Sequence, residues 1–384
     1  MFNSNVFRLL IIFIIFCQNL LPCTTGLVDK KYATNKRAIL WKNRDSSHNK
    51  NELFLFKHNG FKYFGIINNN DTTQVWSGVN NFGFAIMNSE SRDMITVGDS
   101  TYYDDEGYIM KDALQKCKTI DDFEEILKES NKTGRKVTSN FGVIDASGKA
   151  AYFETGNNQF FRFDAENEYI IRANFSMFGR GYEKYGLYRY DRAKEWFAKL
   201  KKQKDLTPNG IINNIIADPY LIPTVTKENF LEYDKVLLYD SICRYSTVAV
   251  SVVEGVKSGE NPEMTTFWVN LGHSAATVSI PLWIYSDSVP QCMEGSEESE
   301  LNKLFRDLRD YIFEGDRKKI SPQKYNETRK SLDVLQKDID EQTSVALKKW
   351  RKIQPKKDEV KIFQDGISKM VVSRVKELLN NLST

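Results

Sequence analysis

The chain of 384 residues has few cysteines and almost no net charge, and both shortages narrow its expected partners. Its five cysteines are widely spaced, so they offer neither a disulfide framework nor a metal motif. The 54 basic residues nearly balance the 51 acidic ones, which leaves a net charge of +3. Since no basic stripe or zinc-finger spacing is present, we do not expect a nucleic-acid partner.

An apolar run near the N-terminus, Leu9–Phe16, follows a short positively charged start. It is too short for a membrane span, which needs ~20 apolar residues, so we expect residues 1–22 to be an export leader. Leu20 and Pro22 are not the small residues that signal peptidase prefers. Cleavage before Cys23 is therefore expected to be partly autocatalytic or to follow an upstream cut. A lipid-modified cysteine or an uncut anchor is the alternative.

Cleavage before Cys23 would give that residue unusual chemistry. One residue would carry a thiol with a pKa near about 8.5 and an α-amine with a pKa of about 7.7–8.0, a nucleophile and a proton acceptor together. No catalytic histidine would be needed. Cys117, Cys243 and Cys292 are expected to be buried small hydrophobic residues instead.

Strand patterns dominate the first three-quarters of the chain, and charged helical patterns follow. The expected strands are Thr25–Lys30, Ala38–Lys42, Glu52–Phe56, Phe61–Ile67, Val137–Ile144, Ala150–Glu154, Phe160–Phe163, Tyr169–Asn174, Ser246–Val253, Met264–Leu271 and Ala276–Ile284. The expected helices are Met110–Cys117, Asp121–Glu129, Tyr188–Lys202, Asn209–Ala217, Ser296–Phe313, Pro322–Trp350 and Val360–Leu382. Runs of strands broken by blocks of helix favour a layered α+β fold over a parallel Rossmann sheet.

The domain organisation follows the same change of pattern. We expect a main domain over residues 23–293 and a helical C-terminal extension over residues 294–384. The extension is interpreted as solvated helices that each pack through one apolar stripe. A dimer arm, or a rim over an active site, is the alternative.

The first two expected strands place two chemically important residues close together. They flank a short turn, so Cys23, before the first strand, should meet Asp45, just beyond the second. Asn59-Gly60 predicts a tight hairpin turn farther on, because both residues tolerate positive φ.

Several ordered motifs resemble one enzyme group. They are Cys23-Thr24-Thr25, Lys42-Asn43-Arg44-Asp45, Gly78-Val79-Asn80-Asn81-Phe82-Gly83-Phe84, Ser139-Asn140-Phe141-Gly142-Val143-Ile144-Asp145, Arg172-Ala173-Asn174-Phe175, Leu271-Gly272-His273 and Ile280-Pro281-Leu282-Trp283. Together they resemble the N-terminal-nucleophile hydrolases of the choloylglycine hydrolase, penicillin V acylase and penicillin acyltransferase group. The resemblance implies a four-layer αββα sandwich and cleavage or transfer at a linear carbon–nitrogen amide bond.

The resemblance also implies roles for individual residues. Cys23 would be the nucleophile, with its α-amine as base, and Asp45 would hold that amine. Asn80 would face the developing oxyanion, and Asn174 would position the amine or the tetrahedral intermediate. Arg244 matches a distal arginine that lowers the thiol pKa.

Lys42 departs from the group, because many relatives carry arginine at that position. Lysine cannot make the same planar two-pronged contact.

We therefore expect an exported amidohydrolase that forms an acyl-enzyme on Cys23 and acts on a small N-acyl amide, without a cofactor or metal. An acyltransferase that passes the acyl group to an amine is the first alternative. A non-catalytic exported or lipid-anchored binding protein is the second. The destination is periplasmic, extracellular or the lumen of an organelle, with no stable membrane span after processing, and a homo-oligomer is an open alternative.

The aromatic residues of the expected hairpin bear on the substrate. Phe54, Phe56, Phe61, Tyr63 and Phe64 would line an apolar acyl pocket or, as alternating aromatics in strands usually do, form core. Bile-acid conjugates, phenoxyacyl amides, acyl-homoserine lactones and peptidoglycan-derived amides all stay open as substrates.

Overall fold

The computed structural model describes residues 23–91, 93–94, 105–180 and 184–382. The expected leader, residues 1–22, lies outside the described residues. Within the described ranges, no helix is long and apolar enough to cross a membrane.

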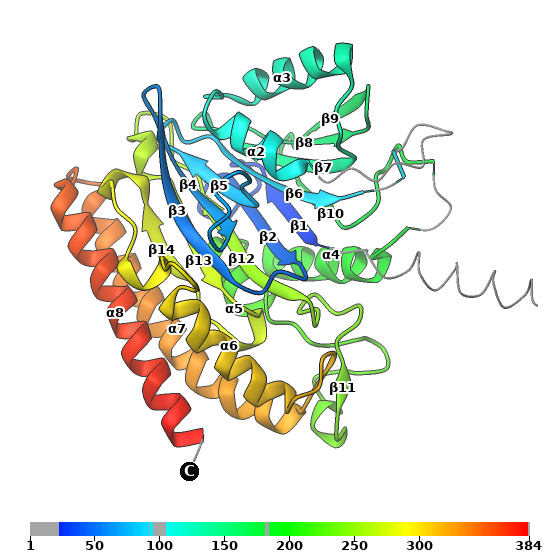
Figure 1. The fold of residues 1–384 in the computed structure, drawn as a ribbon, viewed down its shortest axis with the longest axis vertical. Helices are drawn as coiled ribbons and strands as arrows, with labels where there is room; N and C mark the ends of the chain where they lie inside the picture. Colours follow the sequence, from blue (N-terminus) through cyan, green and yellow to red (C-terminus); the bar gives the residue numbers. More distant parts are fainter. Residues whose placement is uncertain (1–22, 92, 95–104, 181–183, 383–384) are drawn as a thin grey trace, which may run out of the picture.

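Two antiparallel sheets dominate the described part of the chain (Figure 1). The six-stranded sheet has the order β10-β1-β2-β12-β13-β14 and the seven-stranded sheet runs from β3 to β9. The first contains β1 (Thr24–Val28), β2 (Ile39–Asp45), β10 (Tyr169–Arg172), β12 (Thr247–Glu254), β13 (Thr266–Leu271) and β14 (Ile280–Trp283). The second contains β3 (Asn51–His58), β4 (Phe61–Asn68), β5 (Ser77–Asn80), β6 (Ala85–Glu90), β7 (Ser139–Ile144), β8 (Ala150–Thr155) and β9 (Phe160–Asp164). Strands β1 and β2 pack face to face on β6 and β7, so the sheets are stacked.

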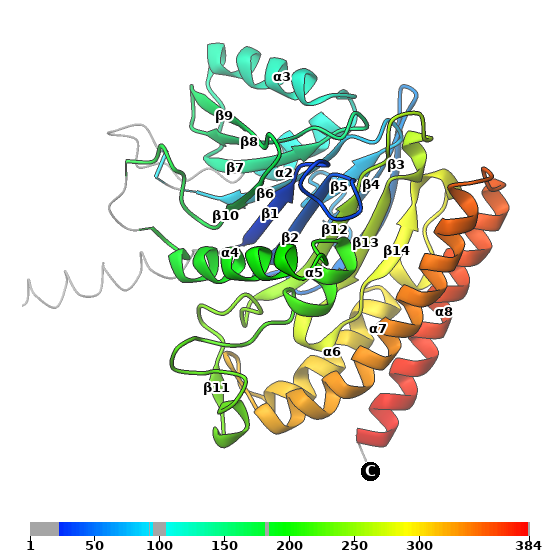
Figure 2. The same cartoon turned by 180° about the vertical axis from the view of Figure 1, so that it is seen from behind.

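Helices cover the outer faces of both sheets (Figures 1 and 2). The helices are α2 (Glu106–Leu114), α3 (Ile120–Thr133), α4 (Leu187–Lys202), α5 (Pro208–Asn214), α6 (Glu300–Phe313), α7 (Pro322–Trp350) and α8 (Lys357–Leu382), and a small ribbon pairs β11 (Val236–Leu237) with β15 (Lys319–Ile320). Helices α2 and α3 lie over the seven-stranded sheet, whereas α4 to α8 lie over the six-stranded sheet. The expected four-layer αββα sandwich is therefore confirmed.

Local sequence signals explain several of these elements. Asn59 and Gly60 both have positive φ, 46° and 82°, and connect β3 to β4 as the predicted hairpin. Thr119 and Asp122 form a reciprocal capping box at the start of α3. Gly26 lets α4 approach β1, because a Cβ there would lie 3.0 Å from the ring of Phe197.

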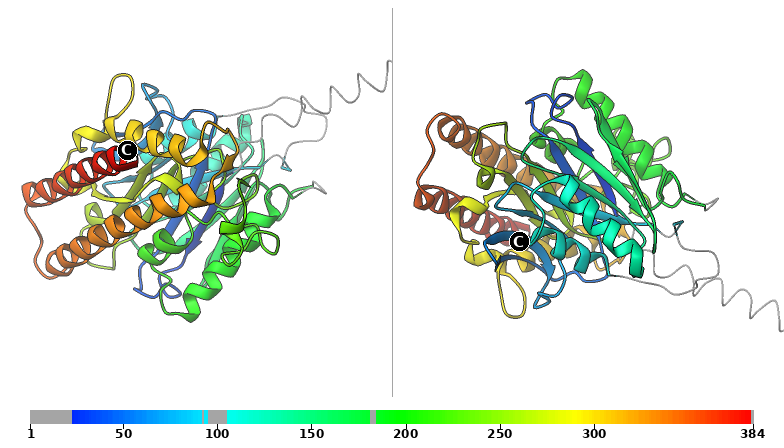
Figure 3. Two further views of the ribbon diagram at one scale, coloured as in Figure 1. Left: turned by 90° about the horizontal axis from the view of Figure 1, so that it is seen from below. Right: turned by 90° about the horizontal axis from the view of Figure 1, so that it is seen from above.

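The C-terminal helices are part of the same packed body. Leu301, Phe305 and Leu308 of α6 are fully buried and belong to the core cluster that contains the six-stranded sheet. Helix α8 packs on β14, and Trp283 of that strand meets Trp350 of α7 edge-on at 5.2 Å between ring centroids. The helical extension is thus present as an outer layer of the sandwich (Figure 3).

The expected strands differ from the observed ones in two ways. Strands β5 and β6 were missed. The strand expected over Ala276–Ile284 is shorter and covers only Ile280–Trp283. Residues 274–276 instead form a 3-10 turn, and the side chain of His273 caps this turn by accepting a hydrogen bond from the Ala275 amide.

Candidate active site

Cys23 lies immediately before β1, at the end of the sheet where β2 finishes. Thr24 pairs with Asn43, so Cys23 comes next to the end of β2, as the sequence predicted. Its thiol is buried, and the backbone N–H of Asp45 donates to the sulfur. Two residues 22 positions apart therefore meet through a single strand pairing.

A pocket of about 370 Å³ opens at Cys23. Polar and charged side chains line it almost throughout. The lining residues are Cys23, Lys42, Arg44, Asp45, Ser46, Ser47, His48, Asn68, Asp71, Gln74, Trp76, Asn88, Glu90 and Glu106. Cys23 precedes β1, and the others come from β2, β4, β6, α2 and the connections between elements. None of the described residues of α6 to α8 belongs to this lining, so the extension forms no rim here.

Lys42 is a buried cation in this pocket. Its Nζ donates to the Trp76 carbonyl at 2.8 Å and to Asn88 Oδ1 at 2.6 Å. Burial lowers the pKa of Lys42 to about 8, against the favourable influence of Cys23. Burial likewise raises the pKa of the Cys23 thiol, and the positive charges of Lys42 and Arg44 oppose that rise. Lys42 therefore stands where a cation favours a thiolate, although it lacks the two-pronged geometry of arginine.

Asp45 is a buried carboxylate near the thiol. Its Oδ1 accepts a hydrogen bond from Thr247 Oγ1 at 2.7 Å. Burial raises the pKa of Asp45 to about 6, while the positive charges of Arg244 and Arg189 act in the opposite direction. The ordinary pKa of an aspartate is about 3.9, so burial moves the pKa of Asp45 toward neutral pH.

Arg244 lies near Asp45 but is not among the residues that line the pocket. Its Nε donates to the Tyr239 carbonyl at 2.7 Å, another nitrogen donates to Ser246, and its guanidinium lies over the ring of Tyr245. Its charge lowers the pKa of Asp45. The structure thus links Arg244 to the carboxylate, whereas the resemblance had linked it to the thiol.

Arg189 of α4 connects Asn174 to Cys23 by donating hydrogen bonds to both. This arginine was not identified from the sequence. Arg189 is only 1% exposed. It donates to the Cys23 carbonyl at 2.8 Å, to Thr24 Oγ1 at 2.9 Å and to Asn174 Oδ1 at 3.1 Å. The amide of Asn174 donates to the Glu90 carbonyl at 2.8 Å. Arg189 therefore holds the backbone of Cys23 in place.

Asn80 has a different environment from the one expected. Its Nδ2 donates to the carbonyls of Leu114, at 3.0 Å, and Cys117, at 2.7 Å. Its Oδ1 accepts from the amides of Phe82 and Phe84. Asn80 is fully buried and does not line the pocket, so these contacts join the β5–β6 turn to the end of α2. This geometry corrects the oxyanion role expected for Asn80.

Asn88, on β6, is the asparagine that faces the pocket. It accepts from Lys42 and donates through Nδ2 to Ser139 Oγ at 3.1 Å. The sequence contained no separate indication of Asn88. It lies eight residues after Asn80, in the second strand of the same hairpin.

The aromatic hairpin forms core. Phe56 and Tyr63 stack at 4.8 Å between ring centroids in the cluster under α2, and Phe64 is buried between the sheets. Phe54 packs against the same outer cluster, and Phe61 packs on Phe82. The aromatic residues of β3 and β4 do not line the pocket at Cys23.

Among the other described cysteines, Cys243 lies 3.9 Å from Nδ1 of His273, a buried histidine whose pKa burial lowers to about 3. Burial raises the pKa of Cys243 to about 12, and it moves the pKa of Cys117 upward too. Both are buried, as expected. No group of three or more His, Cys, Asp or Glu side chains that could hold a metal ion occurs in the described ranges.

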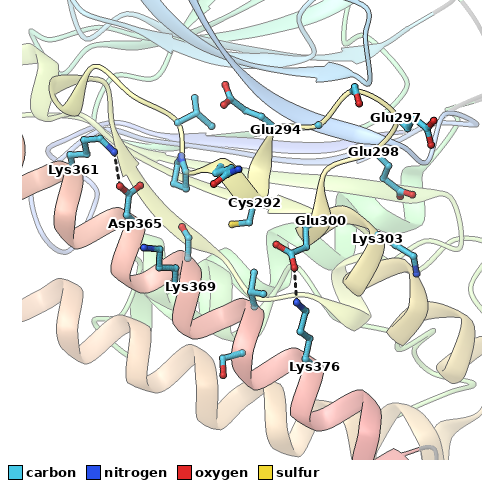
Figure 4. Close-up of a pocket in the computed structure, with 18 residues that line it drawn as sticks. Cys292, Glu294, Glu297, Glu298, Glu300, Lys303, Lys361, Asp365, Lys369 and Lys376 are labelled. Carbon is cyan, nitrogen blue, oxygen red and sulfur yellow. Dashed lines mark hydrogen bonds and ion pairs between the residues drawn. The ribbon is translucent and has the colours of Figure 1, made fainter.

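Cys292 belongs to a separate cavity of about 1110 Å³, between the loop before α6 and helix α8 (Figure 4). Acidic and basic side chains share this cavity. Lys361 pairs with Asp365 within α8, and Lys376 of α8 pairs with Glu300 of α6. Burial raises the pKa of the Cys292 thiol to about 11. Cys292 is only partly buried, so the expectation of a buried small hydrophobic residue is wrong for this cysteine.

The raised pKa of Asp45 predicts a pH-dependent stability change. A carboxyl that binds its proton more tightly in the folded state stabilises the protein at low pH and loses that contribution as pH rises through about 6. Asp45→Asn should therefore gain stability relative to the natural chain at pH 8, and gain about half as much at pH 5, which lies midway between the pKa of about 3.9 in the unfolded chain and the pKa of about 6 in the folded one. Urea unfolding at both pH values measures the difference.

Asp121→Asn provides a control of opposite sign. The hydrogen bond from Arg162 lowers the pKa of this exposed carboxyl, so its ionised form contributes at both pH values. Its replacement should destabilise slightly and equally at pH 5 and 8. A stability change for Asp45→Asn that does not vary between those pH values would contradict the assigned burial effect.

Comparison with known proteins supports the resemblance. Residues 32–221 match the family model described as acyl-coenzyme A:6-aminopenicillanic acid acyl-transferase. No curated protein matches the sequence.

Two solved structures have a similar fold. A variant of conjugated bile acid hydrolase from Clostridium perfringens is 13% identical, covers 69% of this chain and 94% of its own, and gives a TM-score of 0.44. Penicillin V acylase from Agrobacterium tumefaciens is 13% identical, covers 68% of this chain and 86% of its own, and gives a TM-score of 0.42. The family match includes Lys42, Asp45 and Asn174 and begins after Cys23. Over residues 32–221 the chain is therefore similar to the acyl-coenzyme A:6-aminopenicillanic acid acyl-transferase family.

Proposed function

We propose that the chain is an exported cysteine amidohydrolase that begins, after processing, at Cys23. One observation supports this proposal above all: the buried thiol of Cys23 lines one pocket together with a buried cation, Lys42, and a buried carboxylate, Asp45. A carboxylate in that position can hold a protonated α-amine, which a free N-terminal residue would supply.

The reaction we propose has two halves. The α-amine of Cys23 takes the thiol proton, the sulfur attacks the amide carbonyl carbon, and the carbon–nitrogen bond breaks as the ammonium returns the proton to the leaving amine. Water then attacks the thioester, releasing the carboxylic acid and restoring the thiol. Asp45 holds the α-amine in place and accepts a hydrogen bond from it while it is protonated, and Lys42 favours the thiolate.

The pocket lining favours a polar substrate. Trp76 is the large apolar side chain among the described residues of the lining, and the guanidinium of Arg44 already lies over its ring, 4.7 Å from the centroid. A volume of about 370 Å³ lies at the lower end of the usual range for small-molecule sites, ~300–1,000 Å³. We therefore propose a small, polar N-acyl amide rather than a steroid conjugate.

Acyl transfer is the second candidate, because the matched family is described as an acyl-transferase. Its first half-reaction would be the same, and an amine would replace water in the second.

The first test follows maturation and turnover together. The full chain should lose residues 1–22, as intact mass shows, and should then hydrolyse members of a panel of small N-acyl amides. Cys23→Ala should fold but lose turnover, whereas Cys292→Ala should keep it. Activity in Cys23→Ala, or an active chain that retains residues 1–22, would overturn the proposal. Transfer of the acyl group to an added amine faster than to water would favour the second candidate.

Asn88 is proposed to stabilise the oxyanion, because it is the amide side chain of the described lining nearest Lys42. Asn88→Ala should lower kcat by roughly 10²–10³ with a smaller change in KM, as expected for a transition-state donor. Asn80→Ala should instead lower the melting temperature, since it removes buried hydrogen bonds to four backbone groups. Equal kinetic losses in the two variants would reject this assignment.

Arg189 is proposed to position the nucleophile. Arg189→Met should lower kcat by up to about 100-fold, because small misplacements of a reacting group have such effects. The acid limb of the pH profile should also move to higher pH, since the charge of Arg189 lowers the pKa of Asp45. Arg192, one turn along α4, pairs with Asp218 and is the matched control. If Arg192→Met moves the acid limb as far as Arg189→Met does, Arg189 has no such role.

A further inference from the structure

The α7–α8 hairpin is an outer layer of the molecule, where the two helices lie side by side (Figure 3). Val345 of α7 and Ile362 of α8 are both 71% exposed. With Ala346, Trp350 and Phe363 they line a groove of about 610 Å³ between the helices. Single exposed apolar residues are common, but apolar side chains that converge from two helices on one groove indicate a contact surface.

A glycine lies beside this groove within α8. Gly366 is one turn after Ile362, and a Cβ added at Gly366 would meet no atom within 4 Å. Glycine in a helix interior is destabilising relative to alanine, and no atom of the described residues lies close enough to exclude a side chain here. Close approach of another backbone from outside would explain it.

The charges around Val345 indicate which backbone approaches. Glu341 lies four residues before Val345 and Lys349 lies four residues after it, and both line the groove. A second α7, antiparallel and related by a two-fold axis at Val345, would place Glu341 against Lys349 of the partner subunit. The same axis creates the reciprocal pair, so the groove is complementary to itself.

We propose that two copies of this chain associate through α7 and α8 as a symmetric dimer, with the helices antiparallel to their counterparts. The axis passes at Val345, and Ile362 and Gly366 lie against the partner's α8. None of the described groove residues lines the pocket at Cys23, so both pockets stay open. The apolar groove is short, and the association is accordingly expected in the micromolar range. The inference does not depend on the proposed reaction.

Sedimentation velocity of the full chain at increasing concentration tests the dimer. The natural chain should shift from monomer to dimer, whereas Val345→Glu and Ile362→Glu should each stay monomeric. Both positions are exposed, so the variants should fold normally, which circular dichroism checks. Leu231→Glu is the matched control, because Leu231 is exposed and lies outside the groove. It should dimerise like the natural chain.

Charge exchange tests the two-fold arrangement itself. Glu341→Lys and Lys349→Glu should each weaken the dimer at least tenfold in dissociation constant, and the double variant should recover most of the affinity. Lys349 also pairs with Glu359 of its own chain at 2.7 Å, and the double variant does not restore that contact. Recovered affinity in the double variant would therefore come from the ion pair between position 341 of one subunit and position 349 of the other. A chain that stays monomeric, a Leu231→Glu variant as weak as Val345→Glu, or a double variant without recovery would overturn the proposal.

Discussion

The structure depends on burying charged side chains at the end of one strand, β2. Lys42, Arg44 and Asp45 are each no more than 5% exposed, and isolated charges are costly to bury without partners. Their partners come from elements far apart in the sequence. Lys42 donates hydrogen bonds to Asn88 and to the Trp76 carbonyl. Arg44 donates to Asn51 and Asn68. Thr247 donates to Asp45. The stacked sheets therefore do more than form a core, since each supplies the groups that keep these charges in place.

The same arrangement explains how Cys23 is held. Cys23 is fixed on one side by its strand pairing and on the other by Arg189 from the helix layer outside the sheet. Arg189 also contacts Asn174, so the end of β10 is tied to the same point. The C-terminal helices support this assembly from a distance, because they cover β13 and β14 rather than the pocket.

The sequence was sufficient for the layers but not for every side chain. Alternating strands, the Asn59-Gly60 turn and the Thr119 cap are local signals, and the structure contains the elements they predicted. The meeting of Cys23 and Asp45 was also predictable, since it needs only one turn between neighbouring strands.

The choice between Asn80 and Asn88 was not predictable from local pattern. Both asparagines lie in one hairpin, and only the packing of α2 against its turn shows that Asn80 is engaged with the backbone. Arg189 could not be found because its contacts with Cys23 and Thr24 span 166 and 165 residues. An arginine at the start of a helix has no local pattern that distinguishes it from a surface charge.

The central claim is that the thiol of Cys23 carries the acyl group during turnover. Acid quenching within one turnover, followed by digestion and mass analysis of the N-terminal peptide, tests it most directly. The account predicts a peptide that begins at Cys23 and bears one acyl group as a thioester, which hydroxylamine removes. An acyl group on any other residue, or substrate turnover with an unmodified Cys23 peptide at every quench time, would contradict it.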